Sequence, residues 1–192
     1  MTCIAAAIQD GTVWVGGDAL GSSNGFHGAL AHPKVFRKDG AGSPMLLGIA
    51  GSARVAQVLQ YVFTVPEHRT DRKDASEYFC TTFVDEMRKV FKDAGLDKKH
   101  DGQDASDGHV LIGYRGHLYT IYGDYQATEW ATPYAAIGAG EEYAFGSLHT
   151  SADVDWDAEE RVRRALEAAS HFSPWVGPPF TILSLEAEKG RP

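Results

Sequence analysis

The chain has 192 residues, 43% hydrophobic and 23% charged, so a packed domain is expected rather than a disordered chain. Its net charge of −8 argues against general binding to a phosphate backbone, and no apolar run approaches the roughly 20 residues that cross a bilayer. No secretory signal is evident, and two cysteines make neither a disulfide framework nor a four-ligand zinc site. We therefore expect one domain over residues 1–192 in a reducing cytoplasm, with no nucleic-acid or membrane partner and no metal site.

The first fifty residues predict two strand hairpins. Thr2–Gln9 is apolar and extended, Asp10-Gly11 is a strong hairpin turn signal, and Thr12–Gly17 returns along the first strand. A second pair of short strands is expected at Lys34–Arg37 and Met45–Ala50.

Two helices are predicted next. Ser52 is placed to cap the first, and Asp74 with Glu77 forms a capping box at the start of the second, which Gly95 ends. Residues at helical spacing form one apolar face on each helix. These faces comprise Val55, Val58, Leu59 and Val62 in the first, and Phe79, Phe83, Met87, Val90 and Phe91 in the second, with Cys80 expected in or near the core.

The second half begins with a charged segment, Lys98–Asp107, which predicts a polar loop. The elements expected after it are strands at His109–Gly113, His117–Tyr122 and Tyr134–Gly138, helices at Glu141–His149 and Asp157–Ala169, and a last strand at Phe180–Leu185. The second of these helices is expected to bury one apolar face, formed by Ala158, Val162, Ala165, Leu166 and Ala169. Grouped strands and grouped helices favour antiparallel sheets with helices layered outside them. We predict an α+β fold, a four-layer α/β/β/α sandwich with mainly antiparallel sheets.

The extreme N-terminus offers a candidate nucleophile. Met1 precedes the small residue Thr2, and its removal would leave Thr2 with both a hydroxyl and a free α-amine. An α-amine with a reference pKa of ~7.7–8.0 can act as the base that deprotonates the adjacent hydroxyl. By itself this pattern is weak, because many proteins begin with Met-Thr.

The spacing behind Thr2 is more specific. Asp18 and Lys34 lie 16 and 32 residues after Thr2; Asp18 ends one predicted strand and Lys34 begins another. This pattern resembles the proteasome β-subunits and the related HslV protease, which are N-terminal-nucleophile hydrolases, here of the bacterial or phage branch. The resemblance extends over nearly the whole chain. Further matches are Gly17-Asp18, Lys34-Val35, the segment 49–53 (IAGSA) and the segment 136–140 (AIGAG).

The resemblance implies a threonine peptidase that cleaves unfolded polypeptide through an acyl-enzyme on Thr2. In it Lys34 would stabilise the developing alkoxide, Asp18 would keep Lys34 charged and oriented, and the Gly51 N–H would stabilise the oxyanion. Ser22 and the 49–51 backbone match the edges along which the family binds an extended peptide. His32, with Ile49 and Ala53, is a candidate rim of a specificity pocket.

The chain departs from the family pattern at one supporting position. Ala139 stands where the family carries a serine that hydrogen-bonds the catalytic amine, so Ser170, Ser173 or a water would have to position the amine instead. The alternative function is therefore a catalytically silent proteasome-fold protein with an assembly or scaffold role. Cys3 as nucleophile, which breaks both spacings, and an amidase of the same superfamily are less favoured.

The resemblance also implies partners. We expect a homo-oligomeric ring, stacked on a second ring, with subunit contacts near the turn 138–140 and the helix Glu141–His149. An ATPase unfoldase of the AAA+ class is expected as a partner by analogy with HslV. No cofactor is expected, and the same analogy suggests a structural monovalent cation near the last helix.

Overall fold

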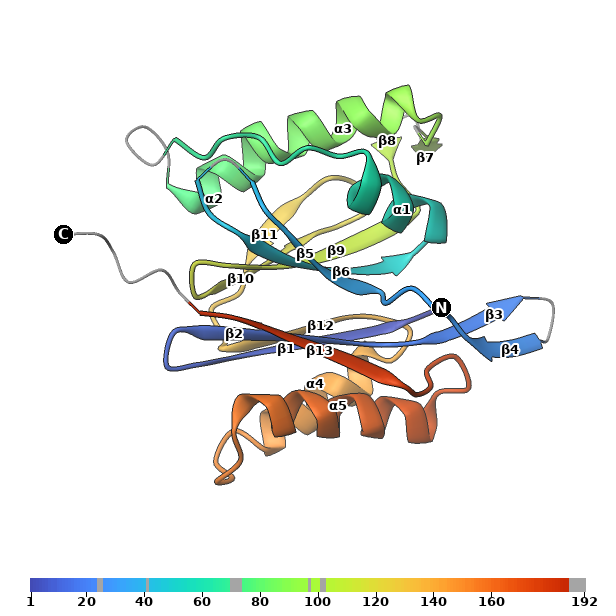
Figure 1. Ribbon diagram of the computed structural model, residues 1–192, viewed down its shortest axis with the longest axis vertical. Helices are drawn as coiled ribbons and strands as arrows, with labels where there is room; N and C mark the ends of the chain where they lie inside the picture. The colour runs from blue at the N-terminus through green and yellow to red at the C-terminus, as the bar shows by residue number, and fades with distance from the viewer. Residues whose placement is uncertain (24–25, 41, 70–73, 97, 101–102, 187–192) are drawn as a thin grey trace.

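Two antiparallel β-sheets are stacked face to face between two layers of helices in the computed structural model of the chain (Figure 1). The structure describes residues 1–23, 26–40, 42–69, 74–96, 98–100 and 103–186. The layer order, helices, sheet, sheet, helices, confirms the predicted four-layer α/β/β/α sandwich.

The first sheet holds the N-terminal hairpin at its centre. Its strands are ordered β12 (Tyr134–Gly138), β1 (Cys3–Gln9), β2 (Thr12–Asp18) and β13 (Phe180–Leu185), and all neighbours are antiparallel. The turn from β1 to β2 has positive φ at Asp10 (51°) and Gly11 (78°), as the predicted hairpin requires.

The second sheet has five strands. They are ordered β11 (Ala127–Glu129), β10 (His117–Ile121), β9 (Gly108–Tyr114), β6 (Met45–Gly51) and β5 (Val35–Lys38), again with antiparallel neighbours. Every strand except the three-residue β11 was predicted. The two sheets meet through alternate residues, so that Ile4 and Ala6 of β1 pack in one cluster with Leu46 and Leu111 of the second sheet.

One helical layer covers the outer face of the second sheet (Figure 1). It contains α1 (Ala53–Tyr61), α2 (Ala75–Tyr78), a π-helical segment (Phe79–Phe83) and α3 (Val84–Asp93). Both predicted caps are confirmed: the Ser52 side chain accepts a hydrogen bond from the Arg54 N–H, and the Asp74 side chain accepts one from the Glu77 N–H.

Two expectations in this layer were wrong. Val62 is 58% exposed, because the chain leaves α1 there and Phe63 turns into the core instead. Cys80 is exposed, because it follows Phe79 by one position and so faces away from the side of the helix that buries Phe79 and Phe83.

The other helical layer, α4 (Glu141–Thr150) and α5 (Ala158–Phe172), packs on the first sheet. Small residues let α5 approach β1 and β2 closely, since a Cβ on Gly16 would lie 2.5 Å from Val162 Cγ1. The predicted apolar face of α5 is confirmed, with all five of its members buried: Ala158, Val162, Ala165, Leu166 and Ala169.

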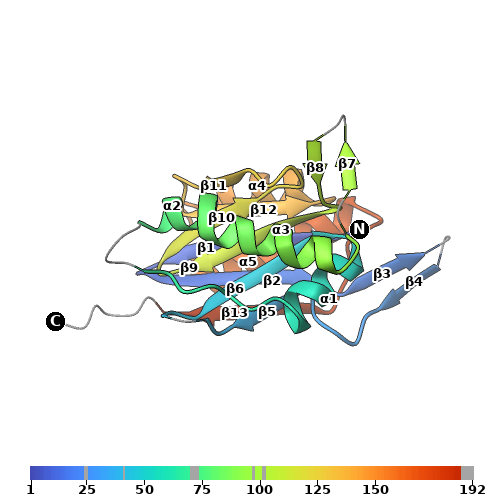
Figure 2. The ribbon, with the colours of Figure 1, turned by 90° about the horizontal axis from the view of Figure 1, so that it is seen from above.

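Two small hairpins project from the sandwich (Figure 2). The first joins β3 (Leu20–Ser23) to β4 (Phe26–Ala29), and the second joins β7 (Lys98–His100) to β8 (Gln103–Ala105). The second hairpin corrects the expectation of a polar loop at Lys98–Asp107. Its two strands pair through the backbone, although the sequence lacks the alternation of apolar residues that predicts a strand. No helix of the described residues is long and apolar enough to cross a membrane.

Candidate active site

A cleft of about 1030 Å³ lies between the β3–β4 hairpin with its following segment and the exposed side of α1. The residues that line it come from the N-terminus, from 20–34 and from 49–62. The cleft brings together six of the predicted site residues: Thr2, His32, Lys34, Ile49, Gly51 and Ala53. Asp18 lies behind the cleft wall and reaches the site through Lys34.

The Asp18 carboxylate ends β2 and is 1% exposed. Its Oδ1 accepts a hydrogen bond from the Cys3 N–H (3.0 Å), and its Oδ2 accepts from the N–H groups of Leu20 (3.0 Å) and Gly177 (3.3 Å). Backbone donors from three separate segments therefore hold this anion in one orientation.

The Lys34 ammonium uses all three of its N–H groups. It donates to Asp18 Oδ1 (2.9 Å), to the Leu20 carbonyl (2.8 Å) and to the Met1 carbonyl (3.0 Å). The side chain is 10% exposed, and this burial lowers the pKa of Lys34, with Asp18 opposing the shift. The ammonium thus lies at the peptide bond that joins Met1 to Thr2.

Thr2 is 5% exposed and immediately precedes β1. Its backbone is enclosed by Gly138, where φ is +98° and an added Cβ would lie 2.4 Å from the Thr2 carbonyl oxygen. A glycine is therefore required at position 138. While Met1 is attached, the Thr2 nitrogen is an amide, and the amine that could act as a base appears only when Met1 is removed.

Gly51 lies where β6 passes into α1. Its φ is +119°, and an added Cβ would lie 2.2 Å from the Asp107 carbonyl oxygen. The same carbonyl accepts a hydrogen bond from the Ser52 N–H (2.8 Å), while Ser52 caps α1. The backbone at this junction is therefore held by β9 on one side and by the helix cap on the other.

The supporting residues expected near the Thr2 amine do not bond to it. Ala139 is exposed, and the Ser173 hydroxyl accepts a hydrogen bond from the Trp175 N–H (3.3 Å) within its own turn. Among the described residues, no hydrogen bond links Ser170 or Ser173 to Thr2. The backbone of Ser22 lies in β3 opposite His27, whereas its side chain lies outside the described part of the structure.

Sequence reasoning missed several contributors. The Leu20 carbonyl, the Gly177 N–H and the Met1 carbonyl are backbone groups, and no side-chain pattern could indicate them. Cys3 is fully buried, and burial raises the pKa of its thiol, so it is not placed as a nucleophile.

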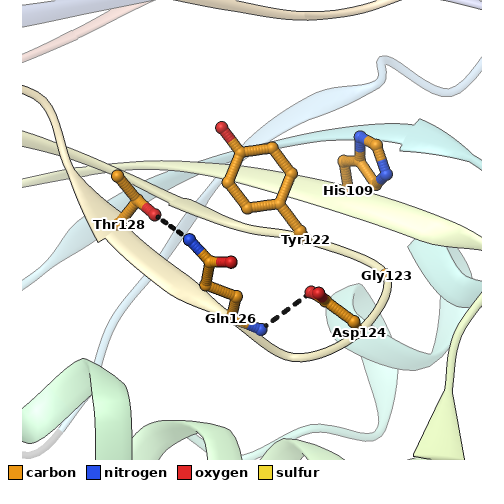
Figure 3. Close-up of a pocket in the computed structure, with 6 residues that line it drawn as sticks. All are labelled: His109, Tyr122, Gly123, Asp124, Gln126 and Thr128. Atoms are coloured by element: carbon orange, nitrogen blue, oxygen red, sulfur yellow. Dashed lines mark hydrogen bonds between the residues drawn. The ribbon is translucent and has the colours of Figure 1, made fainter. Parts of the chain in front are cut away.

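A second hollow of about 520 Å³ lies at the turn after β10 (Figure 3). In its wall the Gln126 N–H donates to Asp124 Oδ1 (3.0 Å), and Gln126 Nε2 donates to Thr128 Oγ1 (3.1 Å). It contains none of the predicted site residues. Within the described ranges, no group of three or more His, Cys, Asp or Glu side chains is arranged to hold a metal ion.

The chain is similar to known proteins over nearly its whole length. The chain is 29% identical over 186 residues to the ATP-dependent protease subunit HslV of Aquifex aeolicus (strain VF5), covering 94% of this chain and 96% of that protein. No protein-family model matches the chain.

Solved structures show the same fold. BPH of Thiobacillus denitrificans, in complex with epoxomicin, superposes with a TM-score of 0.78 at 21% identity, over 96% of this chain and 98% of that chain. Eukaryotic HslV from Trypanosoma brucei superposes with a TM-score of 0.67 at 18% identity, over 96% and 99% of the two chains. The chain is thus a homologue of HslV with the fold of the proteasome-like N-terminal-nucleophile hydrolases.

Proposed function

We propose that the chain is a threonine-type endopeptidase that hydrolyses peptide bonds of unfolded polypeptide through an acyl-enzyme on Thr2. The observation that carries this proposal is the position of the Lys34 ammonium. It is held by Asp18 and the Leu20 carbonyl and reaches the peptide bond on the N-terminal side of Thr2, within a cleft that Gly51 also lines.

In the proposed reaction the free Thr2 amine takes the proton from Thr2 Oγ, which adds to the substrate carbonyl carbon. The negative charge moves to the carbonyl oxygen, where the Gly51 N–H donates to it. The carbon–nitrogen bond then breaks as the amine returns its proton to the leaving nitrogen, and an ester on Thr2 remains. Water attacks this ester with the amine as base, which releases the new carboxyl group and restores the hydroxyl.

Lys34 and Asp18 support this chemistry electrostatically. A fixed ammonium beside Thr2 favours the developing alkoxide and the neutral amine, and it needs no reorganisation during the reaction. After Met1 is removed, its hydrogen bonds to Asp18 and to the Leu20 carbonyl still hold it beside Thr2. The reaction uses only groups of the chain, so we propose no cofactor for it.

The setting and partners are part of the same proposal. The HslV homologue is named as a subunit of an ATP-dependent protease, which supports a homo-oligomeric ring and an ATPase partner for this chain. Both cysteines are free thiols, as is usual in a reducing cytoplasm.

Intact-mass measurement with an epoxyketone tests the proposal, since a relative of the same fold binds the epoxyketone epoxomicin. We expect purified protein to lack Met1 and to gain the mass of one inhibitor per chain, and Thr2→Ala to gain none. Protein that retains Met1 quantitatively and does not react would contradict the peptidase assignment.

Ala139 favours the second candidate, a catalytically silent scaffold, because it offers no hydroxyl to position an amine. Ala139→Ser separates the two. A silent scaffold that fails only for want of this hydroxyl would become reactive toward the epoxyketone, whereas in an active peptidase the substitution changes an existing rate.

A further inference from the structure

The described walls of the cleft carry basic side chains and no carboxylate. Arg54, His27, His32 and Lys34 line it, whereas none of the described lining residues is Asp or Glu. The chain as a whole has 26 acidic and 18 basic side chains. The cleft therefore has a charge pattern opposite to that of the molecule that contains it.

Arg54 is the cation available to a ligand. Lys34 is bound by Asp18 and the Leu20 carbonyl beside the Thr2 backbone. An arginine guanidinium carries its positive charge at every physiological pH. Within the described residues the Arg54 guanidinium has no hydrogen bond or ion pair. Every other arginine among the described residues has a partner in a hydrogen bond, an ion pair or a ring contact.

The stability of α1 does not explain why an arginine occupies position 54. The first turns of α2, α3, α4 and α5 all contain acidic residues, which suit the partial positive charge at the start of a helix. The first turn of α1 contains none and carries Arg54 instead. A side chain that opposes the local preference without a local partner is expected where function requires it.

We propose that Arg54 gives this cleft its substrate preference: the peptidase favours polypeptides with Glu or Asp close to the scissile bond and disfavours Lys and Arg there. This inference rests on the proposed function of the cleft. Arg54 follows Gly51 by three residues, so their Cα atoms are at most ~11 Å apart, and both residues line the cleft. An extended peptide advances ~3.3 Å per residue, so the guanidinium reaches side chains within about three residues of the bond. Its planar fork binds a carboxylate through two hydrogen bonds.

Matched peptides test the preference. The peptides are internally quenched and come in sets of three that differ only by Glu, Gln or Lys at one position near the scissile bond, with one set for each position. Their hydrolysis is measured with wild type, Arg54→Gln, Arg54→Glu and Arg37→Gln. Arg37→Gln is the control, since Arg37 is an exposed arginine that pairs with Asp39 and does not line the cleft. At the preferred position we expect wild type and the control to favour Glu over Lys on the order of tenfold in kcat/KM.

Arg54→Gln should lose this ratio and Arg54→Glu should reverse it. Arg54→Glu should also keep or raise the melting temperature, because it places an acidic side chain in the first turn of α1. A reversed preference in a protein of undiminished stability separates selection by charge from damage to the helix. An unchanged ratio of Glu to Lys in both Arg54 variants would overturn the inference while leaving the peptidase function intact.

Binding provides the readout that is independent of catalysis. The same peptides, fluorescently labelled, are titrated against Thr2→Ala in low and high salt. We expect tighter binding of the Glu peptide, an advantage that salt weakens and that Arg54→Glu/Thr2→Ala reverses. If no peptide is cleaved by wild type, the proposed function fails, and equal binding of the Glu and Lys peptides overturns the inference about Arg54.

Discussion

At the scale of single residues, the site is organised around one ion pair that the surrounding backbone shields from water. Asp18 accepts three backbone N–H donors as well as Lys34, and Lys34 donates to two carbonyls as well as Asp18. Removing two charges from water is costly, and extra hydrogen bonds of this kind offset that cost. The pair is therefore built to hold one ammonium in one place.

Lys34→Ala should lower peptide turnover by about 10²–10³-fold while leaving fold and assembly intact, because it removes fixed charge where charge develops. Lys38→Ala is the matched control, since Lys38 ends the strand that Lys34 immediately precedes and donates to the Gln60 carbonyl rather than to the site. Single-turnover cleavage at equal assembly state measures the effect. Comparable rates for wild type and Lys34→Ala would remove Lys34 from the site, and with it most of the reason for assigning Thr2.

Asp18→Asn should lower the free energy of unfolding by about 3 kcal/mol, because it leaves the Lys34 ammonium without its anion. The asparagine amide cannot replace the carboxylate. N–H donors face both carboxylate oxygens, so in either orientation the NH₂ group of the amide would face an N–H donor. Urea unfolding measures the change. Adding Lys34→Met should recover part of the stability, and a double variant less stable than Asp18→Asn would contradict this account.

The rate should depend on pH through two groups. The Thr2 amine must be neutral, so kcat/KM should rise through a pKa at or below its reference value of ~7.7–8.0, because the Lys34 ammonium is close by. Burial lowers the pKa of Lys34, so the rate should fall at a lower pH than the ~10.4 of an exposed lysine. A falling limb at or above that value would contradict a buried Lys34 at the site.

Stability should respond to the same lowered pKa of Lys34. Between its pKa in the folded chain and the higher pKa in the unfolded chain, the unfolded chain binds more protons. The contribution of Lys34 to the free energy of unfolding therefore increases as pH rises through that window.

At the scale of secondary-structure elements, the junction of β6 and α1 places the expected oxyanion donor. Gly51 has a backbone conformation that residues with L side chains rarely adopt. The carbonyl oxygen of Asp107, the residue before β9, leaves no room for a Cβ. Strand, glycine and capped helix form one unit. A change at the junction should therefore affect both stability and turnover.

Gly51→Ala should cost about 2 kcal/mol or more of stability, and it should lower turnover by about 10²–10³-fold as the N–H is displaced. Gly146→Ala is the control, because a Cβ at this helical glycine of α4 meets nothing within 4 Å. That control should gain about 0.5–1 kcal/mol and cleave at the wild-type rate. Gly51→Ala with wild-type turnover would exclude the Gly51 N–H as the oxyanion donor.

At the scale of the whole molecule, the α4–α5 layer exposes aromatic side chains. Tyr143 (41% exposed) and Phe172 (64% exposed) stack with ring centroids 5.5 Å apart. This aromatic patch includes the helix expected to make subunit contacts. Exposed apolar patches of this kind are typical of protein–protein interfaces.

We expect wild type to sediment as a stable oligomer at micromolar concentration and Phe172→Ser to shift it toward smaller species, since the patch loses its most exposed member. Val154→Ser removes another exposed apolar side chain, 42% exposed and outside the patch, and should leave the sedimentation coefficient unchanged. A stable wild-type monomer would contradict assembly into a ring.

Sequence patterns predicted most of the sandwich because its elements carry strong local signals. The Asp10-Gly11 turn, the caps Ser52 and Asp74, and the apolar face of α5 depend on neighbours within a few residues of each other, and all were confirmed. The β3–β4 and β7–β8 hairpins were missed because their short sequences are rich in Gly, Ser or charged residues and lack the alternation of apolar residues that predicts a strand.

The sequence by itself therefore determined the layered fold and the spacing of Thr2, Asp18 and Lys34, because both depend on residue types at fixed separations along the chain. Only the tertiary structure decided how the site is held and what lines it. The Leu20 carbonyl and the Gly177 N–H belong to the backbone, which is chemically alike at every position and acquires a role only through its place in space. Arg54 likewise became a candidate for substrate selection only when folding placed it in the cleft without a partner.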